Sequence, residues 1–282
     1  MMEGTLWLQF VQQLINGISL GSIYALIALG YTMVYGIMKL INFAHGDIYM
    51  IGSYVGFFAI TAMGLPFVPA ILAAMVMTGI LGMVVERLAY KPLRHSPKIA
   101  ILTTAIGVSL FLEYTTMLAL SPQPRTFPHV LDNSVYHIGG LVISFQQIVI
   151  FLISVVLMLI LTYVVNYTKM GKAMRAVSYD PDAAQLMGIN VDKTISFTFC
   201  IGSSLAGAAG VLVGIYYNSI EPLMGIMPGM KAFVAAVLGG IGIIPGAMLG
   251  GILIGLIEIF VKLFAPGWYE AVTYGTLIVI LL

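Results

Sequence analysis

Long apolar runs, separated by short polar segments, dominate the pattern of the chain. No Asp, Glu, Lys or Arg occurs between Gly4 and Met38, or between residues 48 and 85. A helix needs about 20 apolar residues to cross a bilayer, so both runs are long enough to do so. The runs lack the alternation of about ten residues per strand that marks a membrane β-barrel. The pattern therefore predicts an all-α, polytopic transmembrane helical bundle that forms one domain over residues 1–282.

We expect eight or nine membrane helices, of which at least one is broken or re-entrant. The predicted spans cover residues 10–37, 48–64, 67–87, 99–120, 143–166, 195–217, 230–264 and 271–282. The region 230–264 is ambiguous, because Pro245 in its middle removes a backbone donor and would break a continuous helix. One kinked span, two short spans and a re-entrant hairpin all remain open for it.

Composition excludes a soluble globule. Hydrophobic residues make up 60% of the chain before its 31 glycines are counted, and only 8% of residues are charged. A soluble domain is nearer 25% charged, about three times this value. The net charge is +1 and no basic stripe is present, so a nucleic acid partner has no support. Cys200 is the only cysteine, which excludes a disulfide framework and a thiol metal site and favours a packing role.

Charge distribution predicts the orientation. Eight of the twelve Lys and Arg residues lie in two segments, 87–98 and 167–194. By the positive-inside rule both segments are cytoplasmic. The N-terminus and the loop 121–142 are then periplasmic, and the polar segment 39–47 is expected near the inner face. The longest hydrophilic stretch has about 28 residues and the chain has no P-loop motif, so its energy must come from an ion gradient or a partner.

We make a separate prediction for each end of the chain. The first residues contain Glu3 and no basic residue, and the apolar run that follows is too long for a cleavable signal peptide. We therefore expect the N-terminus to be retained as a membrane span. The chain stops at Leu282 inside an apolar run, so we expect the natural protein to continue beyond it.

A first polar constellation, Asn42-Phe-Ala-His45-Gly-Asp47, interrupts two apolar runs. Three polar side chains beside a glycine are suited to line a solute path through a membrane. The alternative is a plain turn in which Asp47 caps a helix that starts at Ile48. One histidine and one carboxylate are too few ligands for a metal site.

A second constellation lies in the cytoplasmic segment 167–194. Asp180 and Pro181 are typical of a helix start, and Gly188 is typical of a helix end. We expect a two-turn helix at the membrane face that exposes four residues: Ala183, Ala184, Leu186 and Met187. Such a helix suits the docking of a cytoplasmic partner, although an ordinary amphipathic surface helix explains the spacing equally well.

A third constellation is a glycine-rich run. Gly242, Gly246 and Gly250 are four residues apart, a spacing that lets helices approach backbone to backbone. The sharper alternative is a broken helix at Gly242 and Pro245 whose ends face a substrate cavity. Glu258 follows in an apolar run and is a candidate for facing such a pathway.

Four further ionisable residues have structural interpretations. Glu113 and Lys231 lie near span ends, where we expect their side chains to reach toward the interface. Glu86 and Arg87 are adjacent at the inner end of a span, which favours a local pair or an anchor.

The motif Asp182-Ala183-Ala184-x3-Gly188 resembles the Glu-Ala-Ala-x3-Gly coupling loop of ABC-transporter permeases. In that family the loop forms a short helix that sits in a cleft of the ATPase subunit. This sequence has Asp182 in place of the glutamate, and the downstream Ile-x-Leu-Pro of the family is not found.

The chain resembles one family over nearly its whole length. The resemblance is carried by three longer segments, 21–36, 41–47 and 235–247, and by the loop 171–190. It is the branched-chain amino acid ABC transporter permease family, in its shorter, high-affinity LivH-type form. The resemblance implies a bacterial inner-membrane subunit that imports leucine, isoleucine and valine. It also implies a heterodimer with a second permease, two cytoplasmic ATPases and a periplasmic substrate-binding protein, and neither cofactor nor catalytic residue in this chain. Permeases for urea, amides and other amino acids share these motifs.

The resulting hypothesis is one wall of an alternating-access pathway. Helix ends near Asn42–Asp47 and Gly239–Gly246 would supply polar groups to a zwitterion, and a partner ATPase would move the helix 180–188. The rivals are a stand-alone channel or ion-coupled carrier, which would favour buried charge pairs, and a membrane scaffold, which leaves the polar breaks unexplained.

Overall fold

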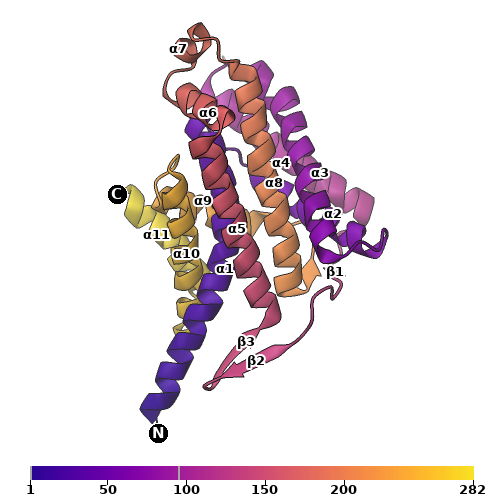
Figure 1. Ribbon diagram of the computed structural model, residues 1–282, viewed down its shortest axis with the longest axis vertical. Helices are drawn as coiled ribbons and strands as arrows, with labels where there is room; N and C mark the ends of the chain where they lie inside the picture. The colour runs from indigo at the N-terminus through magenta and orange to yellow at the C-terminus, as the bar shows by residue number, and fades with distance from the viewer. Residues whose placement is uncertain (1, 95) are drawn as a thin grey trace.

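The computed structural model describes residues 2–94 and 96–282 as an elongated helical bundle (Figure 1). Within these residues, six helices are long and apolar enough to cross a membrane. They are α1 (Met2–Met38), α3 (Phe67–Val85), α4 (Lys98–Leu120), α5 (Phe145–Tyr167), α8 (Val191–Tyr217) and α10 (Ile244–Phe264). The described residues therefore hold six helices of membrane-spanning length, fewer than the eight or nine expected.

The other elements are shorter. Three are apolar helices: α2 (His45–Thr61), α9 (Ile226–Leu238) and α11 (Tyr269–Leu281). A π-helical turn η1 (Glu86–Tyr90) and a 3-10 turn η2 (Lys91–Leu93) continue α3, and α6 (Lys169–Tyr179) and α7 (Pro181–Leu186) follow α5. The strands are β1 (Arg125–Thr126), β2 (Val135–Ile138), β3 (Leu141–Ser144) and β4 (Ser219–Ile220), in the antiparallel pairs β1–β4 and β2–β3. The β2–β3 hairpin and the α6–α7 pair lie at opposite ends of the molecule (Figure 1).

Helix α1 is the centre of the bundle. It packs against α5, α8, α9 and α10, and its middle residues Leu26, Ile27 and Leu29 have no exposed surface. Helix α4 is peripheral by contrast, because Phe111 and Leu118 are exposed along it. An apolar face of this kind is stable only against lipid or another apolar surface.

Glycines bring α10 onto α1 and α9. A Cβ atom added at Gly255 would lie 2.3 Å from the Cα atom of Gly21, and one added at Gly246 would lie 1.8 Å from the carbonyl oxygen of Gly239. Neither distance leaves room for a side chain, so backbone meets backbone at both places. The packing interpretation of the glycine run is therefore correct for Gly246 and Gly250, whose added Cβ would likewise meet the carbonyl oxygen of Ala235 at 2.1 Å.

The ambiguous region 230–264 contains two helices. A turn over residues 239–243 separates α9 from α10, and Gly240 and Gly242 supply its positive φ angles of 87° and 96°. Pro245 lies in the first turn of α10, where a helix has no backbone bond for it to remove. The break therefore comes before the proline, because the glycines turn the chain.

Helix α2 starts three residues before the predicted position. It begins at His45, so Asp47 lies in its first turn and is not its cap. The oxygen of the Asn42 side chain accepts a hydrogen bond from the Ala44 backbone N–H at 3.1 Å. This side-chain turn bends the chain into the helix early, and the prediction that Asp47 caps a helix at Ile48 is wrong for that reason.

The close glycine contact predicts a large effect of a single methyl group. We expect Gly255→Ala to destabilise the detergent-solubilised protein by about 1–3 kcal/mol, because the new atom must displace the α1 backbone. Thermal unfolding followed by circular dichroism measures this. Gly107→Ala is the matched control, since nothing lies within 4 Å of a Cβ added there on α4. Equal melting temperatures of the two variants would contradict the packing.

Candidate functional site

The polar segment before α2 lies deep in the bundle. Asn42, His45 and Asp47 are each at most 2% exposed. The His45 ring packs on Tyr31 at 4.7 Å between centroids, and a Cβ added at Gly30 would lie 2.2 Å from His45 Nε2. Gly30 is about 12 Å before the end of α1 at 1.5 Å per residue, so His45 lies well inside the bundle.

Hydrogen bonds tie this segment to two other elements. The Tyr90 hydroxyl of η1 donates to Asn42 Oδ1 at 2.7 Å, and the Ser109 hydroxyl of α4 donates to Asp47 Oδ2 at 2.5 Å. Asn42 Nδ2 and His45 Nε2 are buried without a hydrogen-bond partner among the described residues. Buried polar atoms are nearly always paired, so these two atoms are exceptions in the interior of the bundle.

The segment also meets the chain that leads into α9. A Cβ added at Gly46 would lie 2.5 Å from the carbonyl oxygen of Gly225, and one added at Gly225 would lie 2.3 Å from that of Gly46. The starts of two short helices, α2 and α9, therefore touch backbone to backbone in the interior of the bundle.

The structure separates the other candidate pathway residues from this segment. Gly242 lies beside Gly36 near the end of α1, with 3.6 Å from a Cβ added at Gly36 to the Cα atom of Gly242. Pro245 follows in the first turn of α10. Glu258 lies further along α10 and lines a cavity that none of the other five candidate residues lines. The six residues therefore lie in three separate places and do not form one site.

Glu258 is the centre of a buried ionic cluster. Its carboxylate accepts a hydrogen bond from the Tyr24 hydroxyl at 2.8 Å and contacts the ammonium groups of Lys231 at 3.0 Å and Lys262 at 2.6 Å. Glu258 is 1% exposed and Lys231 is 5% exposed. The expectation that Lys231 extends to the interface is wrong, because a carboxylate on the neighbouring helix holds it inside. Glu113 was also expected to reach toward the interface, but it is buried, at 7% exposed.

Sequence reasoning missed the partners of Glu258. The spacing of Glu258 and Lys262 by four residues was a readable signal of one pair. Tyr24 and Lys231 come from other helices, so no local pattern could identify them. A cavity of about 380 Å³ adjoins the cluster, and its lining includes Tyr24, Tyr49, Val213, Tyr217, Glu221, Leu223, Met224, Met227, Lys231, Glu258, Lys262, Tyr269 and Glu270.

The short helix α7 has the predicted ends. The Asp180 carboxylate accepts from the backbone N–H groups of Asp182 at 3.0 Å and Ala183 at 2.9 Å. Gly188 has a φ of 82° and follows the last turn, and its N–H donates to the carbonyl oxygen of Gln185. Both ends therefore follow the usual capping chemistry.

The exposed face of α7 differs from the prediction at one position. Leu186 and Met187 are exposed over 88% and 83% of their surface, and Ala183 is exposed as well. Ala184 is 4% exposed, because α7 packs on α6 and α8 and this residue is on the packed side. The expectation that Ala184 is exposed is therefore wrong.

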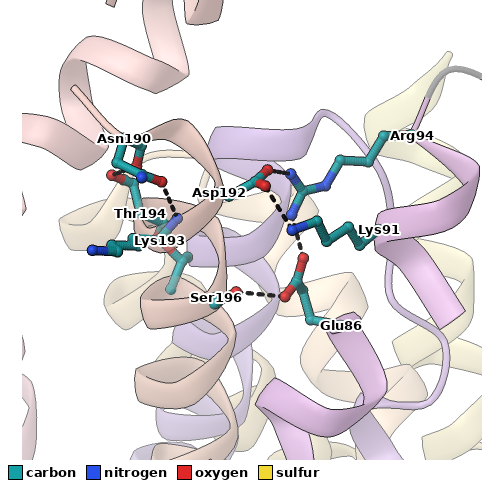
Figure 2. A network of polar contacts seen from close by, with 9 residues as sticks. Glu86, Lys91, Arg94, Asn190, Asp192, Lys193, Thr194 and Ser196 are labelled. Atoms are coloured by element: carbon teal, nitrogen blue, oxygen red, sulfur yellow. Dashed lines mark hydrogen bonds and ion pairs between the residues drawn. The ribbon is translucent and has the colours of Figure 1, made fainter. Parts of the chain in front are cut away.

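A network of charges joins the start of α8 to the end of α3 (Figure 2). Glu86 accepts a hydrogen bond from Ser196 at 2.6 Å and pairs with Arg94. Asp192 pairs with the same Arg94 and with Lys91 at 2.6 Å. Figure 2 shows the Arg94 guanidinium between the two carboxylates, so one cation bridges the two segments.

The network replaces the predicted local pair. Glu86 is completely buried and pairs with Arg94, whereas Arg87 is exposed. A cavity of about 700 Å³ adjoins it, and its lining includes Met38, Arg94, Val177, Asp182, Gln185, Gly188, Asn190 and Asp192. This cavity therefore lies between α7, the end of α1 and the network. Among residues 2–94 and 96–282, no three His, Cys, Asp or Glu residues gather in a way that could hold a metal ion.

A bundle of long apolar helices with a buried polar break defines an integral membrane protein. The profile of a family described as branched-chain amino acid transport system / permease component matches residues 13–282. The chain belongs to this family.

Individual relatives agree over nearly the full length. The high-affinity branched-chain amino acid transport system permease protein BraD of Pseudomonas aeruginosa is 46% identical, over 97% of this chain and 93% of its own. LivH of Escherichia coli K12 is 44% identical, over 98% and 94%. A probable LivH of Methanocaldococcus jannaschii is 31% identical, over 90% and 80%. Among solved structures, PsaBC from Streptococcus pneumoniae in complex with Fab has a TM-score of 0.48 and 14% identity, over 96% of this chain and 90% of that one.

The charge network predicts an asymmetric response to mutation. We expect Arg94→Met to destabilise the protein by about 3 kcal/mol, because the buried Glu86 carboxylate loses its cation. Adding Glu86→Gln to Arg94→Met should restore most of this loss. Denaturation midpoints in detergent measure both effects.

Arg87→Met is the matched control for this experiment. Arg87 is exposed, so its loss should change stability by less than about 0.5 kcal/mol. A larger loss for Arg87→Met than for Arg94→Met would return the pairing to the two adjacent residues and contradict the network.

Proposed function

We propose that this chain is one of the two permease subunits of an ATP-binding cassette importer for leucine, isoleucine and valine in the bacterial inner membrane. The observation that carries the proposal is 46% identity over nearly the full length to a high-affinity branched-chain amino acid permease. The cytoplasmic helix α7, with its exposed apolar tip, adds support, because a transport subunit without an ATP site needs a surface for its ATPase.

The proposed topology has nine crossings, within the expected eight or nine, in one domain over residues 1–282. Helices α2, α9 and α11 join the six long helices. Helices α2 and α9 are short because each follows a non-helical segment, 39–44 and 221–225, that covers part of the depth of the bundle. Broken helices of this kind are common at the substrate sites of transporters.

The proposed orientation places the N-terminus and the loop 121–142 in the periplasm and the segments 87–98 and 167–194 in the cytoplasm. The positions of the β2–β3 hairpin and the α6–α7 pair at opposite ends of the bundle support it (Figure 1). The distribution of Lys and Arg supports the same direction.

The proposed partners are a second, related permease, two cytoplasmic ATPases and a periplasmic substrate-binding protein, with lipid around the bundle. The residues 182–188 dock the ATPase: Asp182 and Ala183 on the exposed start of α7, Ala184 as its packed support, and Gly188 as its end. Leu186 and Met187 form the contact tip, because they are the most exposed apolar side chains of this helix.

The proposed mechanism moves α7 and rocks the bundle. Asp192 at the start of α8 follows α7 directly and is held by Arg94, so a push on α7 reaches both α8 and the end of α3. Solute passes beside the polar segment Asn42–Asp47, where Asn42 and His45 have unpaired atoms. Gly242 and Pro245 form the turn on the cytoplasmic side of this route, and Glu258 lies in a cavity on its other side.

Uptake by the native cells tests the proposal. Deletion of the gene should abolish high-affinity import of radiolabelled leucine, isoleucine and valine, and the intact gene should restore it. Gentle detergent purification should recover two ATPase polypeptides and a second permease. Normal leucine uptake in the deletion strain with loss of urea or amide uptake would assign another solute, and a homo-oligomer free of ATPase would overturn the importer itself.

The exposed tip of α7 predicts a loss of coupling without a loss of protein. We expect Leu186→Glu combined with Met187→Glu to lower uptake about tenfold or more, because two charges replace an apolar contact worth at least 1.4 kcal/mol. The measurements are uptake, the amount of protein in the membrane, and the amount of ATPase that co-purifies.

The control for this prediction is Leu186→Met combined with Met187→Leu, which keeps the tip apolar and should keep uptake. Full uptake by the double glutamate variant, with its ATPase still bound, would remove α7 from the docking surface.

A further inference from the structure

Two cations and one carboxylate form the ionic cluster on α9 and α10. Two ammonium groups, from Lys231 and Lys262, share the single carboxylate of Glu258. The side chains of Lys231 and Glu258 are 6% and 1% exposed, whereas that of Lys262 is 35% exposed, so water reaches Lys262 but not the Lys231–Glu258 contact. Ionic charges in the interior of a membrane protein are costly and are typically found where a function needs them.

A cavity beside the cluster gives a ligand access to both ammonium groups. Its volume is about 380 Å³, within the usual range for small-molecule sites, and both lysines line it. Each ammonium has three N–H donors, and the contact with Glu258 uses one of them. The remaining donors are free to bind an anion that enters the cavity.

Aromatic rings hold the two ammonium groups at the cavity. The Nζ atoms of Lys231 and Lys262 lie 5.0 Å and 4.4 Å from the centroid of the Tyr269 ring. The Tyr24 hydroxyl donates to Glu258 and keeps the carboxylate in place. A cation over a ring face is attracted to it, so the lysines are positioned before any ligand arrives.

The rest of the lining complements an amino acid. Glu221 and Glu270 also line the cavity, where Glu221 is exposed and Glu270 is half-buried. They can meet an ammonium group, whereas the ammonium groups of Lys231 and Lys262 can meet a carboxylate. The apolar side chains Val213, Leu223, Met224 and Met227 line the same space and suit an aliphatic side chain.

We propose that Lys231 and Lys262 form a binding site for the α-carboxylate of the transported amino acid, in the cavity between the end of α8 and helices α9, α10 and α11. The assignment rests on the proposed function, since it takes an aliphatic amino acid as the solute. Glu258 acts as a positioning residue that holds the two ammonium groups side by side.

Lys231→Met separates this role from a structural one. The variant leaves Glu258 paired with Lys262, so the buried carboxylate keeps a cation. A binding site predicts that stability is kept or raised while leucine uptake falls about tenfold or more, the loss expected when a buried anion contact is removed. A structural role predicts a lower melting temperature and uptake that falls only with the amount of protein.

Two further variants complete the experiment. Lys231→Arg keeps the cation and should retain a large part of the uptake, and Lys98→Met removes an exposed lysine outside the cavity and should change neither quantity. Uptake is measured with radiolabelled leucine in native cells that carry each variant on the chromosome, and melting temperature is measured on the purified protein.

The outcomes distinguish the site from the function. Wild-type uptake with loss in Lys231→Met at full stability supports the carboxylate site. Wild-type uptake with normal uptake in Lys231→Met overturns the site and leaves the proposed function standing. Absence of branched-chain amino acid uptake in wild-type cells overturns the proposed function, and the site falls with it.

Discussion

The structure depends on one constraint, which is that polar groups inside the bundle must find their partners within the protein. Water satisfies an irregular backbone or a charge at a soluble surface, but hydrocarbon does not. The chain meets this constraint by placing its breaks against one another. The glycines Gly46 and Gly225 bring the starts of α2 and α9 into backbone contact, and the side chain of Asn42 takes up the Ala44 N–H that the break leaves free.

The same constraint explains why α1 and α8 form the centre and why α4 is peripheral. Helices that carry glycine and small residues can approach until backbones touch, so they enclose the irregular segments and keep lipid away from them. A helix with large apolar side chains, such as Phe111 on α4, has its best partner in lipid. The breaks are therefore protected by the helices that pack most closely.

Features that depend on local chemistry could be predicted from the sequence, and features that depend on partners from other helices could not. The apolar runs gave the long helices, Asp180 and Gly188 gave the ends of α7, and the motifs gave the family. Lys231 was placed at the interface because its partner, Glu258, lies on another helix. Ala184 was assigned to the exposed face because a two-turn helix does not reveal which side its neighbours cover.

The two charge clusters differ in how their charges are paired, and the difference suits the roles proposed for them. The network that joins α8 to α3 has two carboxylates, Glu86 and Asp192, and two cations, so its charges cancel within the protein. A network whose charges cancel resists separation and needs no ligand for its stability. It therefore suits a contact that transmits movement between two helices. In the cluster around Glu258 two cations meet one carboxylate, and Glu221 and Glu270 line the same cavity. Groups of both signs around one cavity suit the proposed zwitterion, because its carboxylate can contact the lysines while its ammonium group contacts a glutamate.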